Sequence, residues 1–103
     1  MQRVYGEFVI NETTSDNVVS LIKEYETSLG INEVPKNFLL RKLGIKVSAA
    51  CDIEINGRQF SVNEKEPLEF GYDSIKVRSI IFKTTGLKAI IRYMYFREDK
   101  VYQ

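Results

Sequence analysis

The chain has 103 residues, with 15 Lys and Arg side chains against 14 Asp and Glu, a net charge of +1 and no histidine. This length suits one domain, and the balanced charge gives no electrostatic footprint for nucleic acid or an anionic membrane. The lack of histidine removes the commonest general base and the commonest transition-metal ligand. We therefore expect a single domain over residues 1–103 that is not an enzyme and that binds no cofactor, metal ion or nucleic acid.

The first residues predict an extended segment. Val4, Phe8 and Ile10 alternate with polar residues, and Gly6 interrupts the pattern, so residues 1–12 are expected to contain a strand or an extended arm. The N-terminus lacks the basic start and the long apolar run of a signal peptide, and nowhere do 18 apolar residues run together. We expect a protein that is made in the cytoplasm and does not enter a membrane.

Two helices are expected to follow. Polar residues 13–16 can cap the first, and Gly30 suits its left-handed end. Between them, apolar side chains recur at helical spacing: Val18, Leu21, Ile22, Tyr25 and Leu29. Pro35 suits the first turn of a second, shorter helix, and Gly44 can end it. The pattern therefore predicts one helix at 14–29 and another at 35–43.

From residue 45 onward the pattern changes to β structure, and its clearest element is a hairpin around Asn56-Gly57. This dipeptide favours a two-residue type I′ turn, in which both residues have positive φ. The turn sets the register of two strands that are apolar on one face and polar on the other. The expected pairs are Cys51 with Val62, Ile53 with Phe60, Asp52 with Ser61, and Glu54 with Gln59.

Further strands are predicted at 45–47, 68–70, 74–82 and 87–96. In 74–82 the apolar positions change phase near Arg78, which indicates either a bulge or a strand covered on both faces. The strand at 87–96 is apolar on both sides, so one side must face the core and the other a helix, a second sheet or another subunit. One side holds Ala89, Ile91, Tyr93 and Tyr95, and the other holds Ile90, Met94 and Phe96.

No group of side chains forms a catalytic or metal-binding motif. Asp52 and Glu54 share the polar face of one strand, which is typical of a solvated hairpin rather than of paired catalytic acids. Cys51 lies on the apolar face and has no histidine to activate it, so its thiol is expected to be buried and inert. We therefore assign no catalytic residue, cofactor site or metal ligand.

The aromatic content carries the most functional information, with six Tyr and six Phe residues. Tyrosine and arginine are enriched in protein interfaces, where large, rigid or bidentate side chains act as anchors. The candidate interface residues are Arg92, Tyr93, Tyr95, Tyr102 and Tyr5. Of the two sides of the last strand, the tyrosine side is expected to form the contact and the methionine side the core, because a hydroxyl tolerates a wet rim.

Three segments of the second half show a recognisable arrangement: the hairpin segment IEING at 53–57, the strand IKVRSIIF at 75–82 and the strand AIIRYMY at 89–95. Together they resemble the β-rich domains of small virion proteins of tailed bacteriophages and prophages, over residues 51–96. The resemblance implies a structural protein of a virion that assembles in a bacterial host. It implies no catalytic residues.

These observations predict an α+β to mainly β fold, with an antiparallel sheet or small β-sandwich over residues 45–96 and one longer and one short helix near the N-terminus. The function they favour is a non-enzymatic structural or assembly subunit in the head, neck or tail of a phage-like particle. Such a subunit would contact other virion subunits or copies of itself and would be oligomeric in its assembly. The alternative is a small β module that binds a sugar or a peptide.

Overall fold

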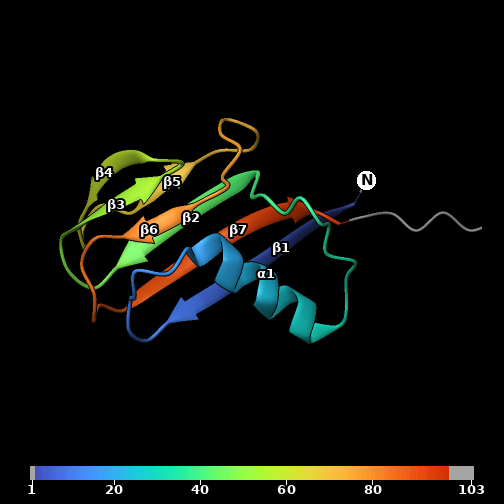
Figure 1. The fold of residues 1–103 in the computed structure, drawn as a ribbon. Helices are drawn as coiled ribbons and strands as arrows, with labels where there is room; N and C mark the ends of the chain where they lie inside the picture. The colour runs from blue at the N-terminus through green and yellow to red at the C-terminus, as the bar shows by residue number, and fades with distance from the viewer. Residues whose placement is uncertain (1, 98–103) are drawn as a thin grey trace, which may run out of the picture.

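The computed structural model describes residues 2–97 and contains two antiparallel sheets and one helix (Figure 1). The elements in chain order are β1 (Arg3–Ile10), α1 (Val18–Leu29), β2 (Lys42–Val47), β3 (Cys51–Ile55), β4 (Arg58–Val62), β5 (Leu68–Phe70), β6 (Ile80–Phe82) and β7 (Ala89–Phe96). One sheet has the strand order β1-β7-β2-β5, and the other has the order β4-β3-β6.

The larger sheet joins the two ends of the described chain. β1 pairs with β7 along its whole length, from Arg3 opposite Phe96 to Ile10 opposite Ala89, with one residue facing one throughout. β7 pairs on its other side with β2, and β2 with the short β5. The strand expected within residues 1–12 is confirmed, and it forms one edge of this sheet.

The predicted hairpin is confirmed in its turn and in its register. Asn56 and Gly57 have φ angles of 53° and 81°, as a type I′ turn requires. Cys51 faces Val62 and Ile53 faces Phe60, while the two polar pairs lie on the other face. β6 pairs with the free side of β3 and completes the smaller sheet.

The predicted strand at 74–82 is interrupted. Only β6 is a strand, and Val77 makes an isolated bridge with Leu40. Between them the Asn56 Oδ1 atom accepts hydrogen bonds from the backbone amides of Arg78 and Ser79, at 2.7 and 3.2 Å. The phase change in the sequence therefore marks a break in the strand, held open by the side chain of the hairpin turn.

The first helix begins at Val18 because Asn17, and not residues 13–16, is its N-cap. The Asn17 Oδ1 atom accepts from the amide of Val19 and also from that of Ile80, both at 3.0 Å, so the cap ties α1 to β6. Gly30 ends the helix at φ 67°, as expected. The buried helix face consists of Val18, Val19, Ile22 and Glu26, whereas Tyr25 and Leu29, which we expected inside, are exposed.

The second helix, expected at 35–43, is absent, and this prediction was wrong. Leu40 and Val77 exchange backbone hydrogen bonds of 2.9 and 2.8 Å, and the Arg41 amide donates to the Met94 carbonyl at 2.8 Å. Leu43 is already part of β2 and lies opposite Tyr93. The backbone groups that a helix would have used locally are thus bonded to segments far along the chain.

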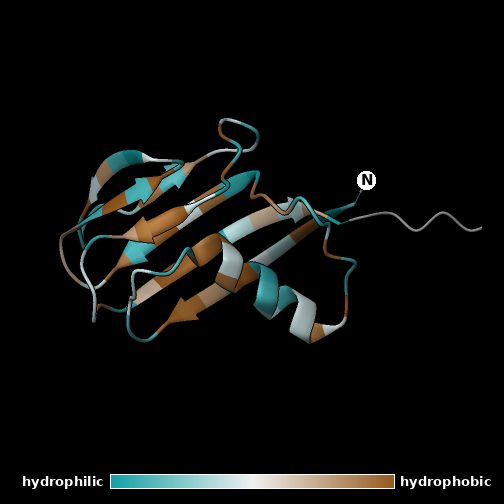
Figure 2. Ribbon diagram, viewed as in Figure 1, coloured by the Kyte–Doolittle hydropathy of each residue, from teal (hydrophilic) through white to brown (hydrophobic). Residues whose placement is uncertain are grey.

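The core contains side chains from the helix and from both sheets. Its fully buried members include Ile22 of α1, Ile45 of β2, Ile53 of β3, Ile80 of β6 and Ile91 of β7. Figure 2 shows hydrophobic segments along these strands and hydrophilic ones in many of the connecting loops. Alternation divides a buried from an outward face most clearly on β2 and β3, whereas β7 is buried on both faces at Tyr93, Met94 and Tyr95.

Candidate interaction surface

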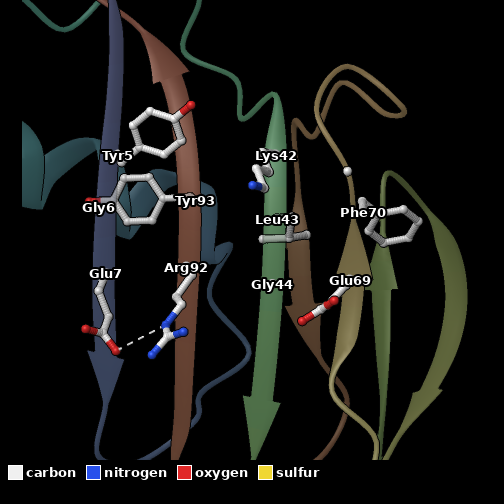
Figure 3. Close-up of a pocket in the computed structure, with 11 residues that line it drawn as sticks. Tyr5, Gly6, Glu7, Lys42, Leu43, Gly44, Glu69, Phe70, Arg92 and Tyr93 are labelled. Atoms are coloured by element: carbon white, nitrogen blue, oxygen red, sulfur yellow. Dashed lines mark ion pairs between the residues drawn. The ribbon is translucent and has the colours of Figure 1, made fainter.

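The two faces of the larger sheet differ in what covers them. On one face α1 packs against the strands: the ring of Tyr25 lies 5.5 Å from that of Phe8, and Glu26 bonds to side chains of β7. On the other face, side chains of all four strands are exposed (Figure 3). We call this second surface the open face; its exposed residues are Arg3, Tyr5, Glu7, Val9, Lys42, Lys46, Glu69 and Arg92.

A groove of about 630 Å³ crosses the middle of the open face. Its centre is Gly44 of β2, which lies opposite Arg92 on one side and Glu69 on the other. A Cβ atom at Gly44 would have only the Arg92 Cβ in contact, at 3.9 Å. The central strand presents no side chain there, and Tyr5 stands at one end of the groove. Phe70, at the other end, has its ring packed edge to face on Phe60 and against the core.

The charges around the groove are balanced. Glu7 and Arg92 form an exposed ion pair, with Oε1 and Nε 3.7 Å apart, and Lys42 and Glu69 add one charge of each sign. A site with balanced charge does not attract a phosphate or a polycation. A partner protein surface that also carries positive and negative side chains can be complementary to the groove.

A cluster of arginine and aromatic side chains lies near one end of β7. The guanidinium of Arg3 is 4.3 Å from the centre of the Tyr72 ring, and that of Arg41 is 5.0 Å from the centre of the Phe96 ring. The two rings meet edge to face at 6.3 Å, and Asp73 binds Arg41 at 2.8 Å. Sequence reasoning missed this cluster because its members come from four separate segments, and only their residue types indicated a role at an interface.

The structure supports some of the predicted interface residues and not others. Arg92 and Tyr5 are exposed on neighbouring strands of the open face. Tyr102 lies outside the described residues. Tyr93 and Tyr95 are 3% and 0% exposed, so our expectation that the tyrosine side of the last strand is a contact surface was wrong. That side faces the core. On the opposite side of β7, Met94 is fully buried as we expected, Ile90 and Phe96 are half-buried, and Arg92 is exposed on the open face.

Tyr93 and Tyr95 face the core because both hydroxyls bind a buried carboxylate. Glu26 is only 5% exposed, and it accepts a hydrogen bond of 2.5 Å from the Tyr93 hydroxyl and one of 2.8 Å from the Tyr95 hydroxyl. Burial, and then the bond to Glu26, raises the pKa of both hydroxyls, so both remain donors. The signal for Glu26 in the sequence was its helical spacing from Val18 and Ile22, which places it on the same face of α1.

The ring of Tyr93 requires a glycine beside it. Gly6 lies opposite Tyr93 in the register of β1 and β7, and a Cβ atom on Gly6 would overlap the end of that ring. The glycine that interrupts the apolar pattern of the first strand therefore makes room for a side chain of the last one.

The remaining candidates for chemistry are few. Cys51 is buried, and burial together with the charge of Asp52 raises the pKa of its thiol. Within residues 2–97, no group of three or more Cys, Asp and Glu side chains is placed to hold a metal ion. In the same part of the chain, no helix has the length and apolar character needed to cross a membrane.

Comparison with known protein families gave no match to this chain, and searches against curated proteins and against solved structures gave no significant match either.

Proposed function

We propose that this protein is a non-enzymatic structural or assembly subunit of a tailed-phage-like particle, located in its head, neck or tail. It contacts other virion subunits or copies of itself. The single observation that supports a contact function is the open face, which spans four strands and ends at β1, a strand that within residues 2–97 pairs on one side only. The particle is suggested by the resemblance of residues 51–96 to small virion proteins.

The properties of the open face suit a protein partner better than a small charged ligand. The groove holds both signs of charge, and the exposed ring of Tyr5 stands at one end of it. Arginine and aromatic side chains gather beside it around Tyr72 and Phe96. Interfaces between proteins favour this combination of balanced charge with aromatic and arginine anchors.

We also propose that the fold is a small β-sandwich with α1 completing one layer. Core side chains come from both sheets, and Phe60 of β4 meets Phe70 of β5 edge to face at 5.5 Å. In this arrangement the smaller sheet and α1 share one face of the larger sheet, which leaves the other face for partners.

The experiment is to ask whether the protein is part of a particle. Particles released from the bacterial host are purified on a density gradient, and the protein is measured across the fractions by mass spectrometry. We expect it to sediment with the particles. A protein that stays at the top of the gradient as a 12.0 kDa monomer would contradict the proposal.

A matched pair of variants tests the open face itself. Arg92→Glu reverses a charge in the groove, whereas Lys65→Glu makes the same change in the exposed turn between β4 and β5. Both positions are exposed, so Lys65→Glu should alter stability by less than about 0.5 kcal/mol. Arg92→Glu also places an acid opposite Glu7 and should cost at most about 1 kcal/mol, which leaves the protein folded. We expect Arg92→Glu to reduce incorporation into particles and Lys65→Glu to leave it unchanged.

A second candidate function is a β module that binds a sugar or a peptide, and the size of the groove favours it. A volume of about 630 Å³ lies in the range of small-ligand sites. Titration of the isolated protein with a glycan and peptide panel, followed by NMR, distinguishes the two functions. Shifts confined to Tyr5, Gly44 and Arg92 would favour the ligand module.

A further inference from the structure

We propose that β1 pairs with β1 of a second copy of this chain, antiparallel and around a two-fold axis at Tyr5. The two larger sheets then join into one continuous sheet across the dimer. This inference rests on the proposed function, because it identifies the contact between copies that an assembly subunit uses.

β1 is a long and regular edge strand of the larger sheet. β1 has eight residues, follows β7 without a bulge and contains no proline, whereas the opposite edge of the same sheet, β5, has only three residues. A long, regular edge presents a row of unpaired amides and carbonyls, and natural proteins usually shorten, bulge or cover such an edge. β1 is not shortened, bulged or interrupted by proline, and the charges of Arg3 and Glu7 are the features of its sequence that restrict which strand can pair with it.

The backbone amides and carbonyls of alternate β1 residues point away from β7. The Arg97 amide donates to the Gln2 carbonyl at 3.1 Å, so Gln2 belongs to a hydrogen-bonded pair with β7. Bonded and non-bonded residues alternate along an antiparallel strand, so Val4 and Gly6 also bond inward. The amides and carbonyls of Arg3, Tyr5 and Glu7 then point to the free edge, where a second strand can reach them.

Charge complementarity between the two copies of β1 selects one register. When Tyr5 lies opposite Tyr5 of the second copy, Arg3 lies opposite Glu7 of the second copy, and the two-fold axis repeats this pair. A shift that places Glu7 opposite itself brings two like charges together, and a shift that places Tyr5 opposite Glu7 pairs no opposite charges. Exposed cross-strand pairs add little affinity, but they choose between registers of otherwise similar backbone pairing.

Exposed apolar side chains lie on both flanks of the β1 edge. Tyr5 and Val9 of β1 are 62% and 60% exposed, and Tyr25, which packs on Phe8 of β1, is exposed on the helix side of the same edge. Leu29 lies one helical turn beyond Tyr25 and is also exposed. Both flanks of the edge therefore carry apolar area that pairing with a second copy brings together.

The experiment uses two single-cysteine variants at equally exposed positions of β1. In the proposed register Tyr5→Cys places two cysteines directly opposite each other, about 5.5 Å apart at Cα, which is a distance that a disulfide spans. Val9→Cys places its two cysteines eight residues apart along the joined strands, roughly 27 Å. The native Cys51 is buried and does not compete. Under mild oxidation, most of the Tyr5→Cys protein should become a covalent dimer and the Val9→Cys protein should remain monomeric on a non-reducing gel.

The charge pair gives a second, independent measurement on the uncross-linked protein. Arg3→Glu should weaken the dimer roughly tenfold in sedimentation equilibrium, since both copies then place two acids together. The exchange Arg3→Glu with Glu7→Arg should restore most of that loss. Arg58→Glu, on an exposed position of β4, is the control and should change nothing.

The outcomes separate this inference from the proposed function. Equal cross-linking at both positions, or none at Tyr5→Cys, overturns the pairing of β1; if the protein still sediments with particles, the proposed function stands and uses another contact. Selective cross-linking at Tyr5→Cys in a protein that never joins a particle supports the pairing and overturns the proposed function.

Discussion

Removing the hydroxyl of Tyr93 should destabilise the fold by an amount that its surroundings define. Tyr93→Phe keeps the ring and deletes one hydrogen bond of 2.5 Å to Glu26, in a site where the two side chains are 3% and 5% exposed. A hydrogen bond to a charged group contributes about 1.5 to 3 kcal/mol. We expect the free energy of unfolding to fall by about 2 kcal/mol, and by a similar amount for Tyr95→Phe.

The double variant Tyr93→Phe with Tyr95→Phe should cost more than the sum of the two, because it leaves the buried Glu26 carboxylate without either hydroxyl donor. Adding Glu26→Leu to the double variant should recover part of the loss, since an apolar group then replaces a buried charge. This recovery distinguishes a hydrogen-bond effect from a packing effect of the two rings.

The assay is urea unfolding. With a slope of roughly 1.5 kcal/mol per molar, a loss of about 2 kcal/mol moves the midpoint down by about 1.3 M. Tyr5→Phe is the control, because Tyr5 is 62% exposed and its change should leave the midpoint in place. A midpoint for Tyr93→Phe that lies within about 0.3 M of the unmodified protein would refute the role assigned to Glu26.

The same pair predicts a loss of stability at alkaline pH. The pKa of each hydroxyl is raised in the folded state above the ordinary tyrosine value of 10.0, so above pH 10 the unfolded chain releases protons that the native protein retains. Ionisation of the two hydroxyls therefore does not change the free energy of unfolding below pH 10. Above pH 10 it lowers that free energy, by at most about 1.4 kcal/mol per pH unit for each tyrosine. The variant with phenylalanine at both positions should lack this part of the pH dependence.

Four other substitutions test particular positions. Gly6→Ala should cost about 2 kcal/mol because the new Cβ displaces the buried ring of Tyr93, whereas Gly44→Ala, with open space around it, should change thermal stability little; equal effects would contradict the close packing at Gly6. Gly57→Val should lower the melting temperature, by roughly 2 kcal/mol in stability, because φ is 81° there; an unchanged melting temperature would count against the type I′ turn. Cys51 should resist thiol reagents in the native state, and Cys51→Ser should cost about 1 to 3 kcal/mol; rapid labelling would place the thiol outside the core.

Features that depend on neighbouring residues were predictable from the sequence. The turn at Asn56 and Gly57 and the pairing of the strands on either side follow from a two-residue loop, and the alternation of apolar and polar residues leaves one register. The end of the helix at Gly30 follows in the same way from a left-handed residue after an apolar stripe. In each case the determining contacts lie within a few residues along the chain.

Features that depend on distant segments required the tertiary structure. Residues 35–43 carry helical spacing, yet their backbone bonds to Val77 and Met94 make them extended. β7 is apolar on both sides, and only the arrival of Glu26 from α1 decides that Tyr93 and Tyr95 face inward. Periodicity shows that two faces of a strand differ, but which face is buried depends on the partner that the rest of the chain brings to it.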